Sequence, residues 1–417
     1  MEKFRINGGK KLEGEIALQS AKNSVLPILA ASLLTDEVVT ILNYPRITDA
    51  DNMTKILKKL GCKVDFEGKD AVICACDATE YQIPENLAKV LRSSIFMLGP
   101  IVARFGKAKV AYPGGCNIGL RPIDQHLMGL KKLGVSVKEE GGYIVCEAQK
   151  LRGADVHFDC PSVGATENVM MLATACEGKT LIRNAAREPE VIDLQNFLNA
   201  MGAKISGAGK NTIVVEGKRK LRGTVYKPLP DRIEAGTFLI AAALTGGEIV
   251  LSNANEEHIF ALIHKLRDSA CKITVNRDKI YIESPGRVKS LRRVETSPYP
   301  GFPTDLQAQL LTLCTVARGT SMIVENLFET RYNHVAELVR MGADVTVCDR
   351  TAVIAGVEKL HGAEVNACDL RGGAALVLAG LVAEGQTVVK NIRHVDRGYE
   401  NFEGKLRTLG ADVRREK

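Results

Sequence analysis

The sequence predicts a protein of the α/β class that folds as two lobes of three similar units each. The chain of 417 residues exceeds the size at which single hydrophobic cores split into domains. Hydrophobic residues make up 45% and charged residues 25%, which is a globular composition and excludes wholesale disorder. A helix-ending pattern recurs about every 70 residues from end to end, which indicates that one structural unit is repeated along the chain.

The repeated pattern is Leu-x-x-(Leu/Met)-Gly, which places a glycine where an amphipathic helix ends in the left-handed conformation. Full copies end at Gly61, Gly134, Gly202, Gly342 and Gly410, and a degenerate copy ends at Ala270. These copies divide the chain into six units.

Each unit contains the same elements in the same order. A short alternating strand follows a Lys-Leu-x-Gly turn such as 11–14, and an Ala/Leu-rich helix comes next, for example over 21–34. A turn leads into a second apolar strand, such as 178–182, and a loop leads to the amphipathic helix that ends in the repeated pattern. A closing strand, such as 212–216, completes the unit. Strands that alternate with helices are typical of α/β proteins.

Polar and basic residues recur at two equivalent positions of the units. The strand-to-helix turns carry Lys22 and Asn23, Arg92, Ser162 to Gly164, Asp231 and Arg232, Thr304 and Asp305, and Asp369 to Arg371. The loops after the second strands carry Arg46, Cys116 and Arg121, Arg187, Asn255, Arg331, and Arg393 and Arg397. Helix N-termini at such turns add positive potential, because their free N–H groups face a bound anion. We therefore expect a basic site between the lobes for a substrate with several anionic groups.

The composition argues against several classes of protein. The 56 basic and 49 acidic residues leave a net charge of +7, which is small for nucleic-acid binding, and 5% aromatic content without Trp offers few side chains for base stacking. The longest apolar stretches, such as 25–34, are about half of a membrane span. Residues 1–5 lack the apolar run of a signal peptide. We expect a cytoplasmic protein without nucleic-acid or membrane partners.

The eleven cysteines favour reduced thiols over a disulfide framework, because they are scattered and odd in number. No Cys-x-x-Cys pair occurs, and Cys74 and Cys76 alternate with apolar residues in what reads as a strand. The seven histidines are dispersed and form no pair at metal-binding spacing. We expect no metal site.

The sharpest local signal is the segment 112–122, which has three Gly and two Pro around Cys116. This composition predicts an exposed, adjustable loop. A thiol there, with Arg121 five residues away, could act as a nucleophile or an acid. The alternative is an inert cysteine that only packs.

Other candidates have an ordinary structural interpretation beside a functional one. Lys22 could lie on a solvated helix face, or it could bind an anion at the first turn of the helix. Asp305 could cap the following helix, or it could be a general base in a basic cleft. Arg331, Arg371 and Arg397 could be surface charges, but they recur at equivalent turns, and Arg suits bidentate capture of phosphate or carboxylate.

Six motifs, in the same order and spread over the whole chain, resemble the UDP-N-acetylglucosamine enolpyruvyl transferase (MurA) family. They are Ala21 to Ser24, Pro113 to Cys116 with Arg121 and Pro122, Ser162 to Thr166, Leu229 to Glu234, Phe302 to Asp305, and Asp396 to Tyr399. The resemblance implies a two-lobed inside-out α/β barrel built from six βαβαββ-like repeats, three per lobe. It also implies that 22–229 form the lobe with the Cys116 loop, and that 1–21 return to join 230–417, with the active site in the cleft between the lobes.

The reaction implied by the resemblance is transfer of the enolpyruvyl group of phosphoenolpyruvate to the 3′-hydroxyl of UDP-N-acetylglucosamine, with release of phosphate. In this family the reaction is the first committed step of peptidoglycan precursor synthesis and proceeds by addition and elimination through a tetrahedral intermediate. The family uses no metal or organic cofactor and needs no obligate protein partner. Closure of the 112–122 loop over the sugar nucleotide would exclude water.

The resemblance also implies roles for individual residues. Cys116 matches the acid that protonates the methylene carbon, the site of a covalent adduct and the target of fosfomycin, and Asp305 matches the acceptor of the sugar hydroxyl proton. Phosphoenolpyruvate is implied to bind Lys22, Asn23, Arg121 and Arg397, with Lys22 and Arg397 also catalytic. The implied sugar-nucleotide contacts are Asn23, Arg92, Arg121, Pro122, Ile123, Asp124, Gln125, Ser162, Val163, Gly164, Asp305 and Leu327, and the supporting residues are Arg331, Asp369 and Arg371.

Three other functions compete with this interpretation. The shikimate-pathway enolpyruvyl transferase shares the fold and the donor, but the Cys116 loop and the 21–24 turn favour the sugar-nucleotide enzyme. A catalytically silent regulatory paralogue would bind the sugar nucleotide without releasing phosphate. A repeat scaffold for protein binding would give no reason for Lys, Arg and Cys to recur at the turns.

Overall fold

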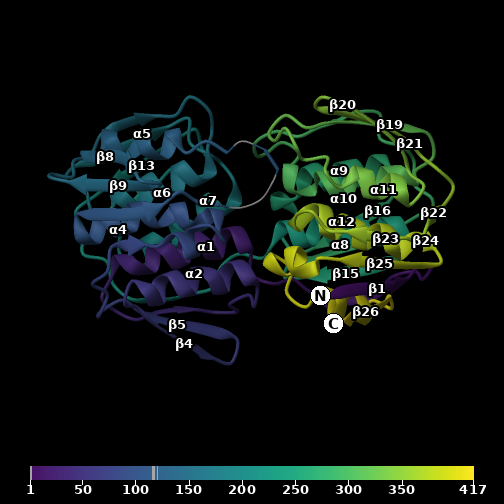
Figure 1. Cartoon of the computed structure of the whole chain (residues 1–417), viewed down its shortest axis with the longest axis horizontal. Coiled ribbons are helices and arrows are strands. Elements are labelled where there is room, and N and C mark those ends of the chain that lie inside the picture. The colour runs from purple at the N-terminus through teal and green to yellow at the C-terminus, as the bar shows by residue number, and fades with distance from the viewer. Residues whose placement is uncertain (1, 115–117, 120) are drawn as a thin grey trace. The chain divides into compact units, whose positions relative to one another are not determined.

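The computed structural model describes residues 2–114, 118–119 and 121–417, and it divides into two compact units (Figure 1). Unit 1 comprises the described residues of 1–19, 117–120 and 230–417. Unit 2 comprises the described residues of 20–116 and 121–229. Each unit contains three four-stranded sheets, and unit 1 has an additional two-stranded sheet.

The three sheets of unit 2 share one topology. In spatial order they are β14 (Thr224–Tyr226), β3 (Val39–Ile41), β5 (Asp70–Cys74) and β4 (Lys63–Glu67); β6 (Gln82–Ile83), β7 (Lys107–Ala111), β9 (Tyr143–Ala148) and β8 (Val135–Glu140); and β10 (Asp155–His157), β11 (Lys179–Arg183), β13 (Thr212–Glu216) and β12 (Lys204–Ser206). In each sheet the first two strands are parallel and the remaining pairs are antiparallel.

The sheets of unit 1 repeat this arrangement. They are β2 (Glu13–Ala17), β15 (Glu248–Ser252), β17 (Lys279–Glu283) and β16 (Lys272–Asn276); β18 (Val294–Glu295), β19 (Thr320–Val324), β21 (Thr351–Ala355) and β20 (Asp344–Cys348); and β23 (Glu364–Asn366), β25 (Gln386–Lys390), β1 (Lys3–Asn7) and β26 (Asp412–Glu416). The short strands β22 (Leu360–His361) and β24 (Ala383–Glu384) form the additional pair. Six sheets of one topology confirm the predicted fold class, with its six repeats in two groups of three.

Buried helices form the centre of each unit, with the sheets outside them. They are α1 (Lys22–Ala31), α4 (Leu98–Phe105) and α6 (Val163–Ala173) in unit 2, and α8 (Arg232–Thr245), α10 (Gln307–Thr315) and α12 (Leu370–Val382) in unit 1. In α12 every residue over 370–381 is buried, as expected of a helix that is apolar on all sides. Figure 1 shows α10, α12 and α8 between the strands of unit 1. This is the inside-out arrangement of an α/β barrel.

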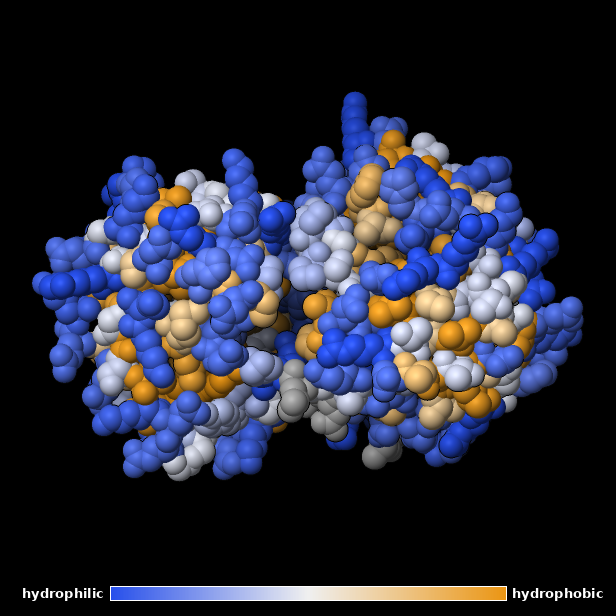
Figure 2. Space-filling view, turned by 90° about the horizontal axis from the view of Figure 1, so that it is seen from above, coloured by the Kyte–Doolittle hydropathy of each residue, from blue (hydrophilic) through white to orange (hydrophobic). Residues whose placement is uncertain are grey.

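Amphipathic helices and short helical turns complete the repeats. The helices are α2 (Thr48–Lys59), α3 (Glu85–Ala88), α5 (Asp124–Lys132), α7 (Pro189–Ala200), α9 (Phe260–Asp268), α11 (Val335–Arg340) and α13 (Phe402–Thr408), and the 3₁₀ turns are η1 (Ser32–Leu34), η2 (Arg92–Met97), η3 (Glu256–His258), η4 (Thr304–Leu306) and η5 (Ile392–Arg397). The helix predicted over 21–34 is α1 followed by η1, so its last turn tightens into a 3₁₀ turn. Figure 2 shows hydrophilic side chains over most of the visible surface, with hydrophobic residues in small patches.

The glycines of the repeated pattern occupy the left-handed conformation that the sequence predicts. Gly61, Gly134 and Gly410 have φ angles of 98°, 94° and 94°. The degenerate copy keeps the same geometry, because Ala270 has a φ of 74°. A residue with a side chain is strained in the left-handed conformation. The degenerate repeat therefore keeps the left-handed backbone conformation at this position although it has alanine in place of glycine.

The first strand of the chain completes the last repeat. β1 lies between β25 and β26 and is antiparallel to both, so that Lys3 faces Lys390 on one side and Glu416 on the other. Arg5 donates to both carboxylate oxygens of Glu416, from Nε at 2.6 Å and from Nη2 at 3.0 Å. The next strand, β2, is the parallel edge strand of the sheet that contains β15.

Two residues of the 112–122 segment are grouped with unit 1. The backbone N–H of Thr330 donates to the carbonyl of Ile118 at 3.3 Å. Gly119 comes so close to Glu329 that a Cβ on it would lie 2.2 Å from the Glu329 Oε2 atom. Only glycine therefore fits this approach without movement of Glu329.

None of the helices in the described part of the chain is long and apolar enough to span a bilayer.

A fully buried carboxyl group, Glu167 on α6, leads to a prediction about stability. Neither of its oxygens has a hydrogen-bond partner among the described residues. Burial, with smaller contributions from Glu190 and Glu188, raises the pKa of Glu167 well above its usual value. The unfolded chain ionises this group above about pH 4.5, so the folded state loses about 1.4 kcal/mol per pH unit from there up to the native pKa.

We expect Glu167→Gln to remove this loss and to stabilise the protein more at pH 8 than at pH 5. Urea unfolding of both chains at the two pH values measures the difference. If the difference in unfolding free energy between the native chain and Glu167→Gln is the same at pH 5 and at pH 8, the carboxyl is ionised in the folded state, contrary to the prediction.

Candidate functional site

The predicted site residues of the strand-to-helix turns lie at the N-terminal ends of the buried helices. Lys22 and the half-buried Asn23 begin α1, and Arg92 begins η2 immediately before α4. Ser162, Asp231 and Asp369 are the N-cap residues of α6, α8 and α12, and Asp305 lies in η4 before α10. The turns that the repeat makes equivalent in sequence are therefore equivalent in the fold.

Asp305 forms the centre of a cluster in unit 1. Arg331 donates from Nη2 to Oδ1 of Asp305 at 2.8 Å, and Arg371 donates to Oδ2 from Nη2 at 2.9 Å and from Nε at 3.3 Å. The two arginine side chains are 4% and 3% exposed, whereas that of Asp305 is 28% exposed. The two guanidinium groups favour the ionised carboxylate, which keeps a surface open to solvent.

Arg371 lies between Asp305 and the ring of Tyr399. Its guanidinium carbon lies 5.4 Å from the centre of the Tyr399 ring, and the Tyr399 hydroxyl is 2.8 Å from the hydroxyl of Thr237. Burial lowers the pKa of Arg371, but nearby Asp305 raises it, and the resulting pKa lies above the usual value for arginine. Arg371 is therefore a permanent, buried positive charge next to Asp305.

Asp369 has a structural role that its contacts show directly. Its Oδ1 accepts the backbone N–H groups of Arg371 at 2.9 Å and of Gly372 at 3.1 Å, which caps α12. This cap fixes the backbone of Arg371, so Asp369 helps to position the Arg371 side chain that contacts Asp305. Asp231 caps α8 in the same way through Ile233 and Glu234.

Glu325 organises the Asp305 turn, and the sequence did not identify it. Its buried carboxylate accepts from the Thr304 hydroxyl at 2.8 Å and from the backbone N–H of Leu327 at 2.8 Å. It also accepts from the Thr296 hydroxyl at 2.8 Å. A single side chain therefore joins the turn that carries Asp305 to the loop that carries the partly exposed Leu327.

Arg397 is the last residue of η5, and Gln19, which follows β2, contacts the residues that come directly after it. The side-chain amide of Gln19 donates to the carbonyl of Gly398 at 2.9 Å, and its oxygen accepts the backbone N–H of Glu400 at 2.8 Å. The backbone N–H of Gln19 donates to Glu234 at 2.8 Å. Glu234 is 1% exposed and pairs with Lys405 at 2.5 Å.

In unit 2, Lys22 forms a buried ion pair. Its Nζ lies 2.9 Å from Oδ2 of Asp49, whose side chain is 1% exposed. Asp49 belongs to the first turn of α2, where a carboxylate also interacts favourably with the helix dipole. Asp49 thus sets the position of the Lys22 ammonium group.

Arg92, Arg121 and His126 lie close enough to affect each other's protonation. Burial and then the charge of Arg121 lower the pKa of Arg92 to about 10. Burial and then the two arginine charges lower the pKa of His126 to about 3, so its ring is neutral at physiological pH. Such a concentration of positive charge is stabilised by a bound anion.

The N-terminus of α6 packs directly on this basic group. A Cβ on Gly164 would lie 2.9 Å from Cε1 of His126, so glycine permits the close approach. The Ser162 hydroxyl accepts the backbone N–H of Ala165 at 3.4 Å, and Val163 opens the helix. Gln125 donates to the sulfur of the exposed Cys160 at 2.8 Å. The first N–H groups of α6 therefore face the region of Arg92 and Arg121.

The other predicted residues are placed as follows. Arg121 and Pro122 are exposed, Ile123 precedes α5, and Asp124 is its exposed first residue. The predicted acid, Cys116, lies outside the described residues. Among the residues that the structure describes, no group of three or more His, Cys, Asp or Glu is arranged to hold a metal ion.

The comparisons with known proteins cover the whole chain. A family model described as EPSP synthase (3-phosphoshikimate 1-carboxyvinyltransferase) matches residues 6–406. UDP-N-acetylglucosamine 1-carboxyvinyltransferase 2 of Caldanaerobacter subterraneus is 54% identical over 413 residues, which is 99% of each chain. The protein of the same name, numbered 1, from Carboxydothermus hydrogenoformans is 51% identical and covers 100% of this chain and 98% of its own. The chain belongs to the UDP-N-acetylglucosamine 1-carboxyvinyltransferase family of enolpyruvyl transferases.

Solved structures agree with this family assignment. The enolpyruvyl transferase NikO of Streptomyces tendae superimposes with a TM-score of 0.88 at 25% identity, over 99% of this chain and 98% of its own. The EPSP synthase of Acinetobacter baumannii superimposes with a TM-score of 0.77 at 17% identity, over 100% of both chains, which shows a shared fold. The Acinetobacter baumannii enzyme shares the fold at 17% identity, whereas the two UDP-N-acetylglucosamine 1-carboxyvinyltransferases named above are 54% and 51% identical to this chain.

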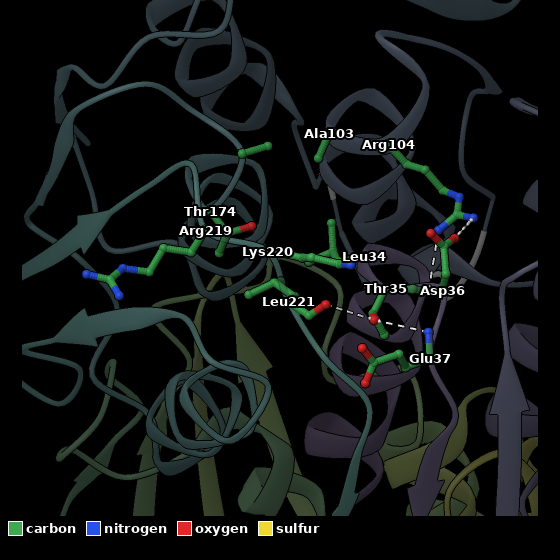
Figure 3. A pocket seen from close by; sticks show the side chains of 11 residues that line it. Leu34, Thr35, Asp36, Glu37, Ala103, Arg104, Thr174, Arg219, Lys220 and Leu221 are labelled. Atoms are coloured by element: carbon green, nitrogen blue, oxygen red, sulfur yellow. Dashed lines mark hydrogen bonds and ion pairs between the residues drawn. The ribbon is translucent and has the colours of Figure 1, made fainter.

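Unit 2 contains a pocket of about 270 Å³ at the C-terminal ends of its buried helices (Figure 3). Its walls follow the C-terminal ends of α1 with η1, of α4 and of α6, through Thr35, Arg104 and Thr174. Lys22, Arg92 and Ser162 lie at the opposite, N-terminal ends of α1, of η2 with α4, and of α6. This pocket is therefore separate from the predicted site residues of unit 2. Helix C-termini are partly negative, and Arg104 meets them by donating to the carbonyl of Leu33 at 3.0 Å.

Proposed function

We propose that this chain transfers the enolpyruvyl group of phosphoenolpyruvate to the 3′-hydroxyl of UDP-N-acetylglucosamine and releases phosphate, as the first committed step of peptidoglycan precursor synthesis. The observation that carries the proposal is identity of 50–54% over nearly full length with relatives named UDP-N-acetylglucosamine 1-carboxyvinyltransferase. The chain is therefore a transferase. A cytoplasmic location is part of the same proposal, because both substrates are phosphorylated metabolites.

The charges of the two clusters suit these substrates. Both substrates are polyanions, and Lys22, Arg92 and Arg121 in unit 2 and Arg331 and Arg371 in unit 1 are basic residues set at or near helix N-termini. In this proposal Lys22, Asn23, Arg121 and Arg397 hold phosphoenolpyruvate. The sugar nucleotide contacts the 121–125 segment, the 162–164 turn, Arg92 and Leu327.

The reaction needs a base at the sugar hydroxyl, and Asp305 is placed for that role. Its carboxylate is 28% exposed while the side chains of Arg331 and Arg371 are buried, so an incoming hydroxyl can approach it from the exposed side. The hydroxyl oxygen adds to the carbon that bears the phosphate while its proton passes to Asp305. Arg331 and Arg371 already donate to Asp305 before the reaction, so they hold its carboxylate in position while it takes the proton.

The methylene carbon of phosphoenolpyruvate takes a proton in the same addition, and we assign that proton to the thiol of Cys116. The tetrahedral adduct carries the phosphate, and elimination expels phosphate and restores the double bond. Lys22 and Arg397 offset the charge that develops on the departing phosphate. When the double bond re-forms, the proton given to the methylene group returns to the Cys116 thiolate, and the proton held by Asp305 leaves with the phosphate, so the cycle closes.

The decisive experiment is phosphate release from phosphoenolpyruvate, measured with and without UDP-N-acetylglucosamine, for the native chain and for Cys116→Ser. We expect release that requires the sugar nucleotide and that falls by about 10²-fold or more in the variant, as for loss of a general acid. A folded native chain that releases no phosphate would contradict the proposal and favour a silent paralogue. Shikimate 3-phosphate serves as the control acceptor, and turnover with it would favour the shikimate-pathway enzyme.

A further inference from the structure

Two thiols touch each other at the end of β5, in unit 2. The sulfur atoms of Cys74 and Cys76 are 2.9 Å apart. Cys74 is the last residue of β5 and Cys76 lies in the turn that follows, so the chain bends between them and brings the two side chains together. Cys76 is exposed and Cys74 is partly exposed, so a reagent in solution can reach both. Two adjacent, accessible thiols can bind one centre through two sulfur atoms.

The backbone that carries the two thiols is firmly held. Arg104 donates from Nη2 to the carbonyl of Ala75, the residue between the two cysteines, at 2.7 Å. The same nitrogen donates to Oδ1 of Asp36 at 2.6 Å, a contact drawn in Figure 3. The sulfur of Cys74 lies 3.6 Å from the carbonyl of Asp36. Little conformational freedom is lost when the pair binds a ligand, because its backbone is already fixed.

Charged neighbours surround the pair. Lys63 faces Cys74 across the β4–β5 pairing and forms an ion pair with Asp77 at 2.7 Å. The contact with Cys74, followed by burial and Asp77, raises the pKa of Cys76, while Lys63 opposes the rise. The raised pKa keeps Cys76 protonated, so its proton passes to the oxygen that leaves the incoming reagent, and Lys63 and Arg104 lie beside the segment that carries the pair.

The surroundings limit the number of ligands to two. The third nearby thiol, Cys62, is buried, and burial raises its pKa to about 12. Within the described residues, no group of three or more potential metal ligands exists here or elsewhere. Structural zinc sites require four ligands, so the pair does not suit zinc. The pair suits an atom that has a high affinity for sulfur and needs only two sulfur ligands.

We propose that Cys74 and Cys76 form a dithiol site for trivalent arsenic that carries one organic group. Each thiol gives up its proton, two arsenic–sulfur bonds form, and the arsenic–oxygen bond of the reagent breaks, with the oxygen and the two protons leaving as water. Arsenic remains trivalent, so no oxidant or reductant is needed. This site does not depend on the proposed enzymatic function.

Phenylarsine oxide is the probe that tests the proposal. The full-length chain is reduced with a phosphine, desalted without oxygen, treated with one equivalent of the probe and then challenged with excess glutathione. We expect one phenylarsenic group to remain on the native chain by intact mass, because a monothiol does not displace a cyclic two-sulfur adduct. Trypsin then locates the adduct on residues 70–89, a peptide whose only cysteines are Cys74 and Cys76.

Variants sharpen the result. Cys74→Ser and Cys76→Ser should each lose the glutathione-resistant adduct, whereas Cys160→Ser, which removes a single exposed thiol, should keep it. An excess of 2,3-dimercaptopropanol should strip the adduct from the native chain. The proposal is overturned if glutathione alone removes the group, if the adduct maps to another peptide, or if the double variant Cys74→Ser/Cys76→Ser retains it.

Discussion

Asp305→Asn is expected to lower kcat for sugar-dependent phosphate release by about 10²- to 10⁴-fold, which is the usual contribution of a general base. Asparagine keeps the shape of the side chain and can still accept a hydrogen bond from Arg331 or Arg371, but it cannot take a proton. The exposed side of Asp305 is where the hydroxyl must approach, since the two arginines occupy its buried side. Steady-state kinetics with both substrates varied provide the measurement.

Three further readouts separate this loss from simple misfolding. The variant should bind UDP-N-acetylglucosamine with little change, because the effect is on kcat rather than on KM. The acidic limb of the pH–rate profile should disappear with the carboxylate. Asp155→Asn, which breaks an exposed pair with Arg183, is the matched control and should retain normal turnover. An Asp305→Asn chain with kcat within threefold of native would rule out the proposed base.

Lys405→Met is expected to destabilise the protein by about 3–5 kcal/mol, the usual effect of leaving a buried charge without its partner. Burial raises the pKa of Glu234, and Lys405 is the neighbour that most strongly opposes that rise. Without Lys405, the Glu234 carboxyl group must either take up a proton or remain as an unpaired buried charge, and both cost stability. The backbone N–H of Gln19 donates to this carboxylate, so the segment next to Arg397 should loosen as well. The shift of the urea midpoint measures the effect.

A double variant provides the control for this buried pair. Glu234→Gln/Lys405→Met replaces both charges, and it should recover most of the stability that the single substitution removes. Lys272→Met breaks an exposed pair with Glu283 at 2.9 Å and should change stability by less than about 1 kcal/mol. If Lys405→Met has no more effect than Lys272→Met, the buried pair does not stabilise the protein.

The repeat made much of the fold predictable. The glycines at 61, 134, 202, 342 and 410 mark helix ends with a local signal, because each needs the left-handed conformation. The turns at Lys22, Arg92 and Asp305 were found because they recur at equivalent positions, and equivalent positions in sequence become equivalent positions in the fold. Periodicity therefore predicted where the charged side chains begin their helices.

The partners of those side chains could not be predicted in the same way. Gln19 and Glu234 are 215 positions apart, and although Glu234 belongs to the 229–234 motif, nothing in that motif indicates Gln19 as its partner. Asp49 looks like any acidic residue in the first turn of a helix until the structure places it against Lys22. Glu325 follows a strand and carries no periodic signal, although four of its neighbours donate to it. Such contacts depend on tertiary packing, which no local pattern encodes.

The position of β1 has a consequence for how the chain is made in the cell. Arg5 is translated long before its partner Glu416, which lies 411 positions further along. At about 5–20 residues per second, roughly 20–80 s of translation separate the two. During that time the inserted segment of 20–229 can complete its own three sheets, while the first strand remains without its neighbours. Strand β1 is thus synthesised before the strands on either side of it, and its sheet in unit 1 is complete only once β26 has emerged and paired with it.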